Sequence, residues 1–188
     1  MLDPGFDSIR TTLQSALAPP FVVAVTSTQS KDGKTALATG TARAFARAGF
    51  ETLVLDANPL APSIGAALGL GELPVPPSLD PDALVTKGAG GLLQAASIAS
   101  HKLAEAGDAS SVSKLATALR AKYAVTIVDL AELFYGPFCV AWSSASDGVV
   151  IAARYARVAD DEDRRLVATL ERANALVIGC VPTSFPAR

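Results

Sequence analysis

The chain has 188 residues, of which half are hydrophobic and 18% are charged, and its 16 basic and 18 acidic side chains give a formal net charge of −2. This length suits one domain around a single core, residues 1–188, and the apolar composition excludes intrinsic disorder. The near-neutral charge offers no general attraction for nucleic acid or for an anionic membrane surface, so we expect no nucleic-acid partner.

The amino-terminal residues lack the pattern of a signal peptide. Asp3 and Pro4 stand where a signal peptide carries basic and then apolar residues. No apolar run approaches the roughly 18 to 20 residues that a membrane-spanning helix needs, so we expect a cytoplasmic protein. Cys139 and Cys180 lack CxxC spacing and lie in apolar surroundings, so both are expected to be buried thiols and no zinc site is predicted.

Short apolar runs rich in valine and isoleucine alternate with amphipathic stretches, an order typical of a parallel sheet wrapped by helices. The predicted strands cover residues 21–26, 52–56, 91–98, 125–129, 148–153 and 175–181. Most of these runs are continuously apolar, so both faces of the sheet are expected to be covered. The predicted fold class is α/β, with a doubly wound, mostly parallel sheet and helices on both faces.

Amphipathic stretches between these runs predict helices. They cover residues 37–48, 111–122 and 160–173. In the first of them Leu37 and Phe45 repeat at helical spacing, and Gly49 supplies a stop signal. The acidic residues 160–163 lie at the positive end of the last helix dipole, which explains them without a catalytic role. Residues 71–82 contain four prolines and are predicted to form a surface loop.

The segment SKDGKT, residues 30–35, lies directly between the first predicted strand and the first predicted helix. A phosphate-binding loop needs inward-facing backbone N–H groups, a lysine for the phosphates and a following hydroxyl for Mg²⁺. Gly33, Lys34 and Thr35 supply these parts, although Thr28 replaces the first glycine of the usual pattern. The alternative is an ordinary strand-to-helix turn with an exposed lysine. The predicted nucleotide-binding residues are Gln29, Ser30, Lys31, Asp32, Gly33, Lys34 and Thr35.

Two aspartates end predicted strands, Asp56 in LVLDANPLAP and Asp129 in YAVTIVDL. Both therefore project at the carboxyl edge of the sheet, where open α/β folds bind their ligands. A carboxylate at this edge can hold Mg²⁺ or orient an attacking hydroxyl. Either aspartate alone could be a helix cap or a surface charge, but three matching strand ends in this order favour a shared site. The predicted metal ligands are Thr35, Asp56 and Asp129.

The order SKDGKT, LVLDANPLAP, YAVTIVD, SDGVVIAARYARV and VIGCV resembles the cytoplasmic ATP-binding domain of bacterial tyrosine kinases of capsule and exopolysaccharide synthesis. These kinases belong to the MinD/ParA group, so the resemblance implies a SIMIBI-type P-loop NTPase fold that uses ATP and Mg²⁺. It also implies that Lys34 and Asp56 are catalytic, with Lys34 binding phosphates and Asp56 acting as the base. Thr35 and Asp129 would hold the metal.

The resemblance also implies protein partners. The kinases act with a membrane polysaccharide chain-length determinant, or co-polymerase, which would place this chain at the inner face of the membrane. Segment 1–18 resembles the helix through which the kinases form homo-oligomers. Of the charged residues in that motif Arg10 remains, while Pro4 and Asp7 replace the others. Ring assembly of the family type is therefore not expected.

Several residues depart from the family pattern. Lys31 stands at a position usually held by glycine, and Asn58 replaces the second aspartate of the second motif, which predicts weaker Mg²⁺ binding. Residues 130–132 read Leu-Ala-Glu where the kinases have Thr-Pro-Pro. Pro182 and Thr183 stand where an asparagine often contacts the adenine base in the kinases. Each departure touches a part of the apparatus that would handle the nucleotide.

The sequence shows no terminal tyrosine cluster of the kind that accepts phosphate in these kinases. Tyr123 and Tyr155 flank apolar runs and are expected to pack against the sheet, which leaves Tyr135 as the expected exposed tyrosine. His101 is the only histidine and is expected at the surface, so no separate Ser-His-Asp triad is predicted. Trp142 is expected to pack on the sheet.

Two functions from different classes stay open. The first is an ATP-dependent phosphotransferase of the protein-tyrosine kinase type, or a slow ATPase, in exopolysaccharide or capsule biosynthesis or its regulation. The second is a catalytically degenerate scaffold that regulates the membrane chain-length protein. The intact Lys34, Asp56 and Asp129 favour turnover, whereas the departures favour a scaffold. A MinD-like positioning ATPase is disfavoured because Gln29 stands at the position of the signature lysine of that group.

Overall fold

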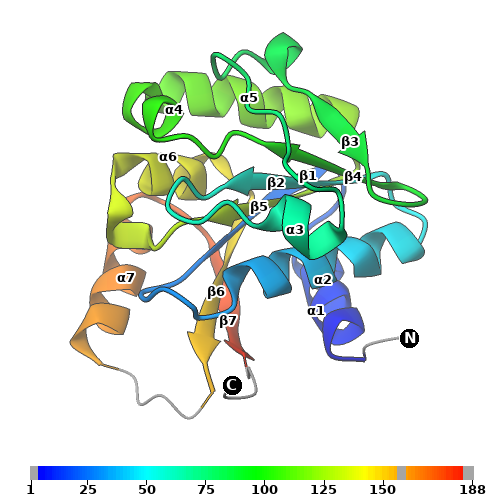
Figure 1. The fold of residues 1–188 in the computed structure, drawn as a ribbon. Helices are drawn as coiled ribbons and strands as arrows, with labels where there is room; N and C mark the ends of the chain where they lie inside the picture. The colour runs from blue at the N-terminus through cyan, green and yellow to red at the C-terminus, as the bar shows by residue number, and fades with distance from the viewer. Residues whose placement is uncertain (1–3, 156–159, 184–188) are drawn as a thin grey trace.

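The computed structural model describes residues 4–155 and 160–183. These residues form a seven-stranded sheet in the order β3-β4-β2-β5-β1-β6-β7 (Figure 1). Neighbouring strands run parallel, except that β3 pairs antiparallel with β4. The strands are β1 (Phe21–Thr26), β2 (Thr52–Ala57), β3 (Thr86–Gly88), β4 (Leu93–Ser97), β5 (Val125–Leu130), β6 (Gly148–Arg154) and β7 (Val177–Thr183). Every predicted strand therefore forms, and β3 was not predicted.

The helices of the described residues connect these strands. They are α1 (Pro4–Ala16), α2 (Lys34–Arg47), α3 (Ile64–Leu68), α4 (His101–Ala106), α5 (Ala109–Lys122), α6 (Pro137–Ala145) and α7 (Asp161–Arg172), with short 3₁₀ turns η1 (Pro81–Ala83) and η2 (Leu133–Tyr135). The three helices predicted from amphipathic spacing are present as α2, α5 and α7, and α1 lies within the predicted segment 1–18. The sequence prediction missed α3, α4 and α6.

Apolar side chains of the central strands pack against helices on both faces of the sheet. On β1, Val22 and Ala24 belong to a buried cluster with residues of α5, α6 and α7. The alternate residues Phe21, Val23 and Val25 belong to a second cluster with residues of α1, α2 and α3. Figure 1 shows α5 on one side of the sheet and α1 and α2 on the other. Because each side of the strand is buried, the predicted doubly wound α/β class is confirmed.

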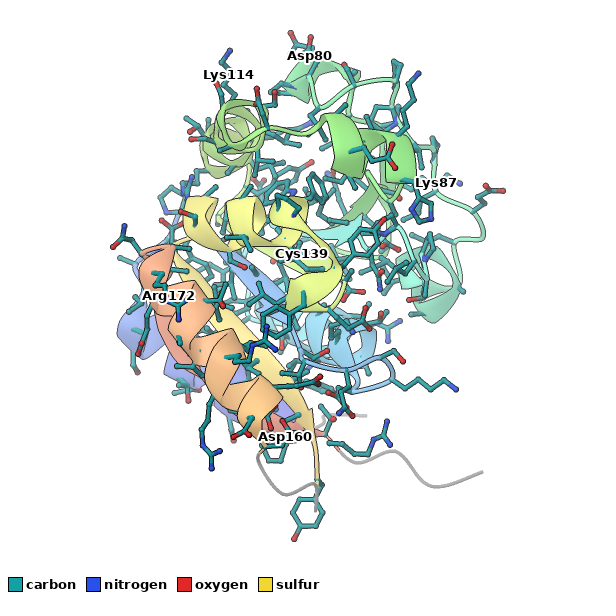
Figure 2. All side chains as sticks on the ribbon, turned by 90° about the vertical axis from the view of Figure 1, so that its left-hand side faces the viewer. Asp80, Lys87, Lys114, Cys139, Asp160 and Arg172 are labelled. Atoms are coloured by element: carbon teal, nitrogen blue, oxygen red, sulfur yellow. The ribbon has the colours of Figure 1, made fainter. Side chains whose placement is uncertain are left out.

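The acidic start of α7 has the structural role that was predicted for it. The Asp160 carboxylate accepts hydrogen bonds from the backbone N–H groups of Glu162 and Asp163, and Asp163 bonds back to the Asp160 N–H. Figure 2 shows Asp160 at this end of α7 and Arg172 at the other. The charges thus complement the helix dipole at both ends.

The environment of the cysteines and tyrosines corrects three predictions. Cys139 is buried as expected, but Cys180 is exposed because it lies on β7, which pairs only with β6 at the edge of the sheet. Tyr123 is buried as expected, but Tyr155 follows the end of β6 and is 71% exposed, so it does not pack on the sheet. Tyr135, the expected exposed tyrosine, is instead half-buried, because its hydroxyl lies 2.7 Å from Nδ1 of His101. His101 is exposed, as predicted.

The sheet order places the predicted site residues at one edge. Strand β1 has β5, β2 and β4 on one side and β6 and β7 on the other, so the direction in which strands are added reverses at β1. Such a switch point brings together the loops that follow β1, β2 and β5. Among the described residues no helix has the length and apolar character needed to cross a membrane.

Candidate functional site

The loop after β1 is a compact turn that starts α2. Gly33 has φ 85° and precedes the first helical residue, Lys34. Asp32 is fully buried, and its Oδ2 accepts from the Gln29 N–H at 3.3 Å. The Thr183 hydroxyl of β7 donates to the Asp32 carbonyl at 2.6 Å, which ties the turn to the sheet. The predicted strand, loop and helix arrangement around SKDGKT is present (Figure 1).

Thr28 occupies the position where the usual pattern has its first glycine. Its hydroxyl donates to Oδ1 of Asp163 in the first turn of α7 at 2.9 Å. Nη2 of Arg154, at the end of β6, lies 3.9 Å from Oδ1 of Asp32. The loop is therefore held by residues of β6, β7 and α7 as well as by its own turn.

Lys34 is 5% exposed, which excludes the alternative of a turn with an exposed lysine. Its Nζ donates to the Ser27 hydroxyl at 3.1 Å and to the Gln29 carbonyl at 3.5 Å. It also forms an ion pair with Glu132 Oε1 at 3.0 Å. The ammonium group thus lies inside the loop, where a phosphate-binding lysine is required.

Thr35, Asp129 and Ser63 meet beside Lys34. The Thr35 hydroxyl donates to Asp129 Oδ2 at 2.6 Å and lies 2.9 Å from the Ser63 hydroxyl. Asp129 is fully buried, and its other oxygen, Oδ1, has no hydrogen-bond partner. Burial raises the pKa of Asp129 to about 7, the Thr35 hydrogen bond opposes this shift, and the nearby charge of Asp56 adds to it. A buried carboxylate oxygen without a partner destabilises the folded protein unless a cation or proton binds it.

Asp56 lies directly beside Asp129, since the two residues are register partners on β2 and β5. Its carboxylate accepts hydrogen bonds from the backbone N–H groups of Asn58, Ser63 and Ile64 at 3.2, 2.8 and 3.0 Å. Burial raises the pKa of Asp56, and these three hydrogen bonds oppose the shift. In this arrangement Asp56 holds the loop that brings Ser63 to Thr35.

Asn58 has a structural role in that loop. Its side-chain oxygen accepts from the N–H groups of Leu60 and Ala61 at 3.2 and 3.4 Å, and the residue is 5% exposed. This is the Asx turn that asparagine commonly forms. The side chain is thus engaged with its own loop.

The oxygen donors around Thr35 fit a magnesium ion. Mg²⁺ prefers hard oxygen ligands and usually binds one or two protein groups together with waters and substrate phosphates. The Thr35 hydroxyl and the free Oδ1 of Asp129 provide such donors at the start of α2. Within residues 4–155 and 160–183 no three His, Cys, Asp or Glu side chains are grouped to enclose a metal ion by themselves. The site therefore suits a metal that arrives with a phosphate ligand.

Of the predicted residues of loop 29–35, Thr35 contacts Asp129 and Lys34 lies near enough to affect its charge, whereas Ser30 and Lys31 are exposed. Asp147, the second residue of the motif SDGVVIAARYARV, lies instead at the amino end of the sheet, where its carboxylate accepts from the Val22 N–H and from Arg120. Sequence reasoning missed three neighbours of the site: Ser27, Ser63 and Glu132. Glu132 could have been found from the sequence, because it lies three residues after Asp129 within a segment that departs from the family pattern.

Lys31 has φ 63°, a left-handed conformation that favours glycine, and its side chain is exposed. We expect Lys31→Gly to raise the free energy of unfolding by up to about 1 kcal/mol, because it removes the steric strain of a Cβ in this conformation. Lys31→Ala is the control, since it removes the charge and keeps the strain. Urea denaturation of the three proteins measures the difference, and a less stable glycine variant would contradict it.

Comparison with known proteins supports the fold described above. The family model described as the CobQ/CobB/MinD/ParA nucleotide binding domain matches residues 23–188. No curated protein shows significant sequence similarity to the chain. Three solved structures with similar folds are the kinase domain of Escherichia coli tyrosine kinase ETK, the VpsO kinase domain and the septum site-determining protein MinD of Pyrococcus horikoshii with Mg-ADP.

These structures share the fold at low sequence identity. ETK has a TM-score of 0.76 and 16% identity, and the alignment covers 97% of this chain and 78% of ETK. VpsO has a TM-score of 0.80 and 18% identity, and the alignment covers 97% of this chain and 94% of VpsO. MinD has a TM-score of 0.71 and 12% identity, and the alignment covers 86% of this chain and 69% of MinD. The alignments with the two kinase domains cover nearly all of this chain.

Proposed function

Because the chain belongs to the CobQ/CobB/MinD/ParA nucleotide-binding domain family, we propose that loop 29–35 binds ATP together with Mg²⁺. The observation that carries this proposal is the buried Asp129 oxygen without a partner, next to the Thr35 hydroxyl at the start of α2. The carboxylate and hydroxyl would hold Mg²⁺, and the metal would neutralise phosphate charge. The Mg-ADP complex of MinD shows that this fold accommodates such a ligand in a related protein.

The start of α2 supports the phosphate part of the proposal. This helix has 14 residues, and its first N–H groups and dipole favour an anion. Lys34 lies at this end and is buried inside the loop, so its charge acts in a partly desolvated environment. These groups would bind the β- and γ-phosphates and stabilise charge during their transfer.

We propose phosphoryl transfer of the tyrosine-kinase type as the reaction, with Asp56 accepting the proton of the attacking hydroxyl. The fold similarity to two kinase domains and the motif order support this choice. Oδ2 of Asp56 accepts two backbone N–H groups and Oδ1 accepts one, so Oδ1 keeps a lone pair that could accept the proton.

The setting is exopolysaccharide or capsule biosynthesis, with a membrane chain-length determinant as the protein partner. This part of the proposal rests on the motif resemblance. In α1, Arg10 bonds to Gln14 and to Asp7, and Asp7 also pairs with Arg47 of α2 at 3.6 Å. These charges are used within the chain, so a homo-oligomer through α1 would need other contacts than the family's ion network.

A second candidate function is a nucleotide-binding scaffold without phosphoryl transfer. The observation that favours it is that Lys34 is paired with Glu132 and that both Asp56 oxygens are bound by backbone groups. Such a protein would regulate the same membrane partner through its conformation. It would bind ATP but turn it over at the background rate.

The two candidates are separated by incubating the protein with γ-labelled ATP and Mg²⁺ and a tyrosine-containing copolymer. Transfer of label to tyrosine, lost in Asp56→Asn, is the result expected for the proposed kinase. Release of labelled phosphate without transfer indicates an ATPase. Binding of ATP with neither product would contradict the kinase proposal and favour the scaffold. Asp82→Asn, at an exposed loop residue, is the control for the charge change.

A further inference from the structure

The strongest unexplained feature of the site is the ion pair between Glu132 and Lys34. The two side chains are 18% and 5% exposed, and Nζ lies 3.0 Å from Oε1. Residue 132 stands in the segment that replaces the family's Thr-Pro-Pro. A carboxylate therefore lies against the lysine that the proposed function assigns to phosphate.

The lysine has no hydrogen-bond donor to spare in this arrangement. An ammonium group has three donors. Those of Lys34 contact the Ser27 hydroxyl, the Gln29 carbonyl and Glu132. A phosphate that binds Lys34 must displace one of these acceptors. Glu132 carries a negative charge and would repel a phosphate, so it is the acceptor whose displacement is required.

The backbone around Glu132 is fixed, so its side chain is the part that can move. The Leu133 N–H donates to the Ser27 carbonyl at 3.0 Å, and Leu133 is buried. The Thr26 hydroxyl donates to the Ala131 carbonyl at 2.9 Å, and the Tyr135 N–H donates to the Glu132 carbonyl at 2.9 Å. The bonds of Ala131 and Leu133 anchor the segment to the end of β1 on both sides of Glu132, and the Tyr135 bond fixes the turn that follows.

We propose that Glu132 is an autoinhibitory residue that occupies the phosphate-binding donor of Lys34 and competes with the phosphates of a nucleotide for it. The inference rests on the proposed nucleotide function and adds a specific competitor within the chain. Nucleotide binding then exchanges one anion for another at Lys34. Glu132 lowers the affinity for phosphate and stabilises the nucleotide-free protein.

The test is the affinity of wild type and Glu132→Gln for ADP and for inorganic tripolyphosphate, measured by titration calorimetry. Glutamine keeps the size of the side chain and a hydrogen-bond acceptor for Lys34 but removes the charge. We expect about tenfold tighter binding of both ligands, because the variant removes the negative charge that competes with the phosphates for Lys34 and repels them. A tenfold change in affinity corresponds to about 1.4 kcal/mol. Glu105→Gln, at an exposed residue of α4, has the same change in net charge and is expected to bind as wild type.

Thermal unfolding adds a second readout. The nucleotide-free Glu132→Gln protein should unfold at a lower temperature than wild type, because Lys34 loses its charge partner, and saturating ADP should raise its unfolding temperature by more. Equal or weaker ligand binding by Glu132→Gln, with wild type still binding ADP, would overturn the inference and leave the proposed function intact. No binding of ADP by either protein would overturn both. Binding by Glu132→Gln alone would support both.

Discussion

Lys34→Ala is expected to weaken binding of Mg-ATP by about 30-fold or more, since loss of one member of a desolvated charge pair costs about 2 to 5 kcal/mol. The reason is the position of Nζ, which lies inside loop 29–35 with the lysine only 5% exposed. In the proposed complex this buried ammonium contacts the β- and γ-phosphates. Isothermal titration with Mg-ATP measures the loss.

Two comparisons make this result specific. Lys102→Ala, at an exposed position of α4, removes the same charge away from the site and should bind as wild type. Because Lys34→Ala also leaves Glu132 without its partner, the double variant Lys34→Ala, Glu132→Gln separates lost phosphate binding from lost stability. Unchanged affinity of a folded Lys34→Ala protein would contradict the assignment of Lys34 to the phosphates.

Asp129→Asn is expected to abolish the dependence of nucleotide binding on Mg²⁺ and to stabilise the ligand-free protein above pH 7. The carboxylate is fully buried, and burial raises its pKa to about 7 from an ordinary value of 3.8. An asparagine of the same shape retains an acceptor for the Thr35 hydroxyl but cannot carry the charge that attracts the metal.

The pH dependence follows from the two pKa values. Below pH 3.8 Asp129 is protonated in both the folded and the unfolded chain, so its ionisation does not change the free energy of unfolding. As the pH rises from 3.8 to about 7, the unfolded chain ionises first, so the folded state loses stability; above about 7 the loss is complete. The asparagine variant lacks this loss. Above pH 7 its free energy of unfolding should exceed that of wild type by a few kcal/mol, since a shift of one pKa unit corresponds to about 1.4 kcal/mol.

Urea denaturation of both proteins without Mg²⁺ or nucleotide across this pH range measures the gain as a difference between variants. Asp82→Asn, at an exposed loop position, should show no such gain. If Asp129→Asn were less stable than wild type at every pH, the carboxylate would be a structural hydrogen-bonding group. That outcome would contradict its assignment as the metal ligand.

The sequence predicts the central strands because burial on both faces requires continuous apolar residues, as in β1, β2 and β5. It fails for α6 because PFCVAWSSA combines residues common in strands with no polar face to mark a helix, and Phe138, Cys139 and Trp142 are all buried. Trp142 itself packs in the core on the sheet, as predicted. The edge strand β3 has three residues, too few for a periodic pattern.

The site is predictable as far as it depends on strand ends. Lys34, Asp56 and Asp129 follow or end buried parallel strands, and such strands bring their carboxyl ends to one edge. The contact between Lys34 and Glu132 is different, because it depends on the conformation of the loop after β5 and joins residues 98 positions apart. The same holds for Ser63, which reaches Thr35 because Asp56 binds the N–H groups of its loop.

The most direct test of the central claim is the affinity of wild type for ATP measured with Mg²⁺ and again with the metal removed by a chelator. Saturable binding that is markedly tighter with Mg²⁺ is the predicted result, because the free oxygen of Asp129 and the Thr35 hydroxyl lie ready for a metal carried by phosphate. Absence of binding at millimolar ATP in both conditions, by wild type and by Glu132→Gln, would contradict the claim that this loop is a nucleotide site.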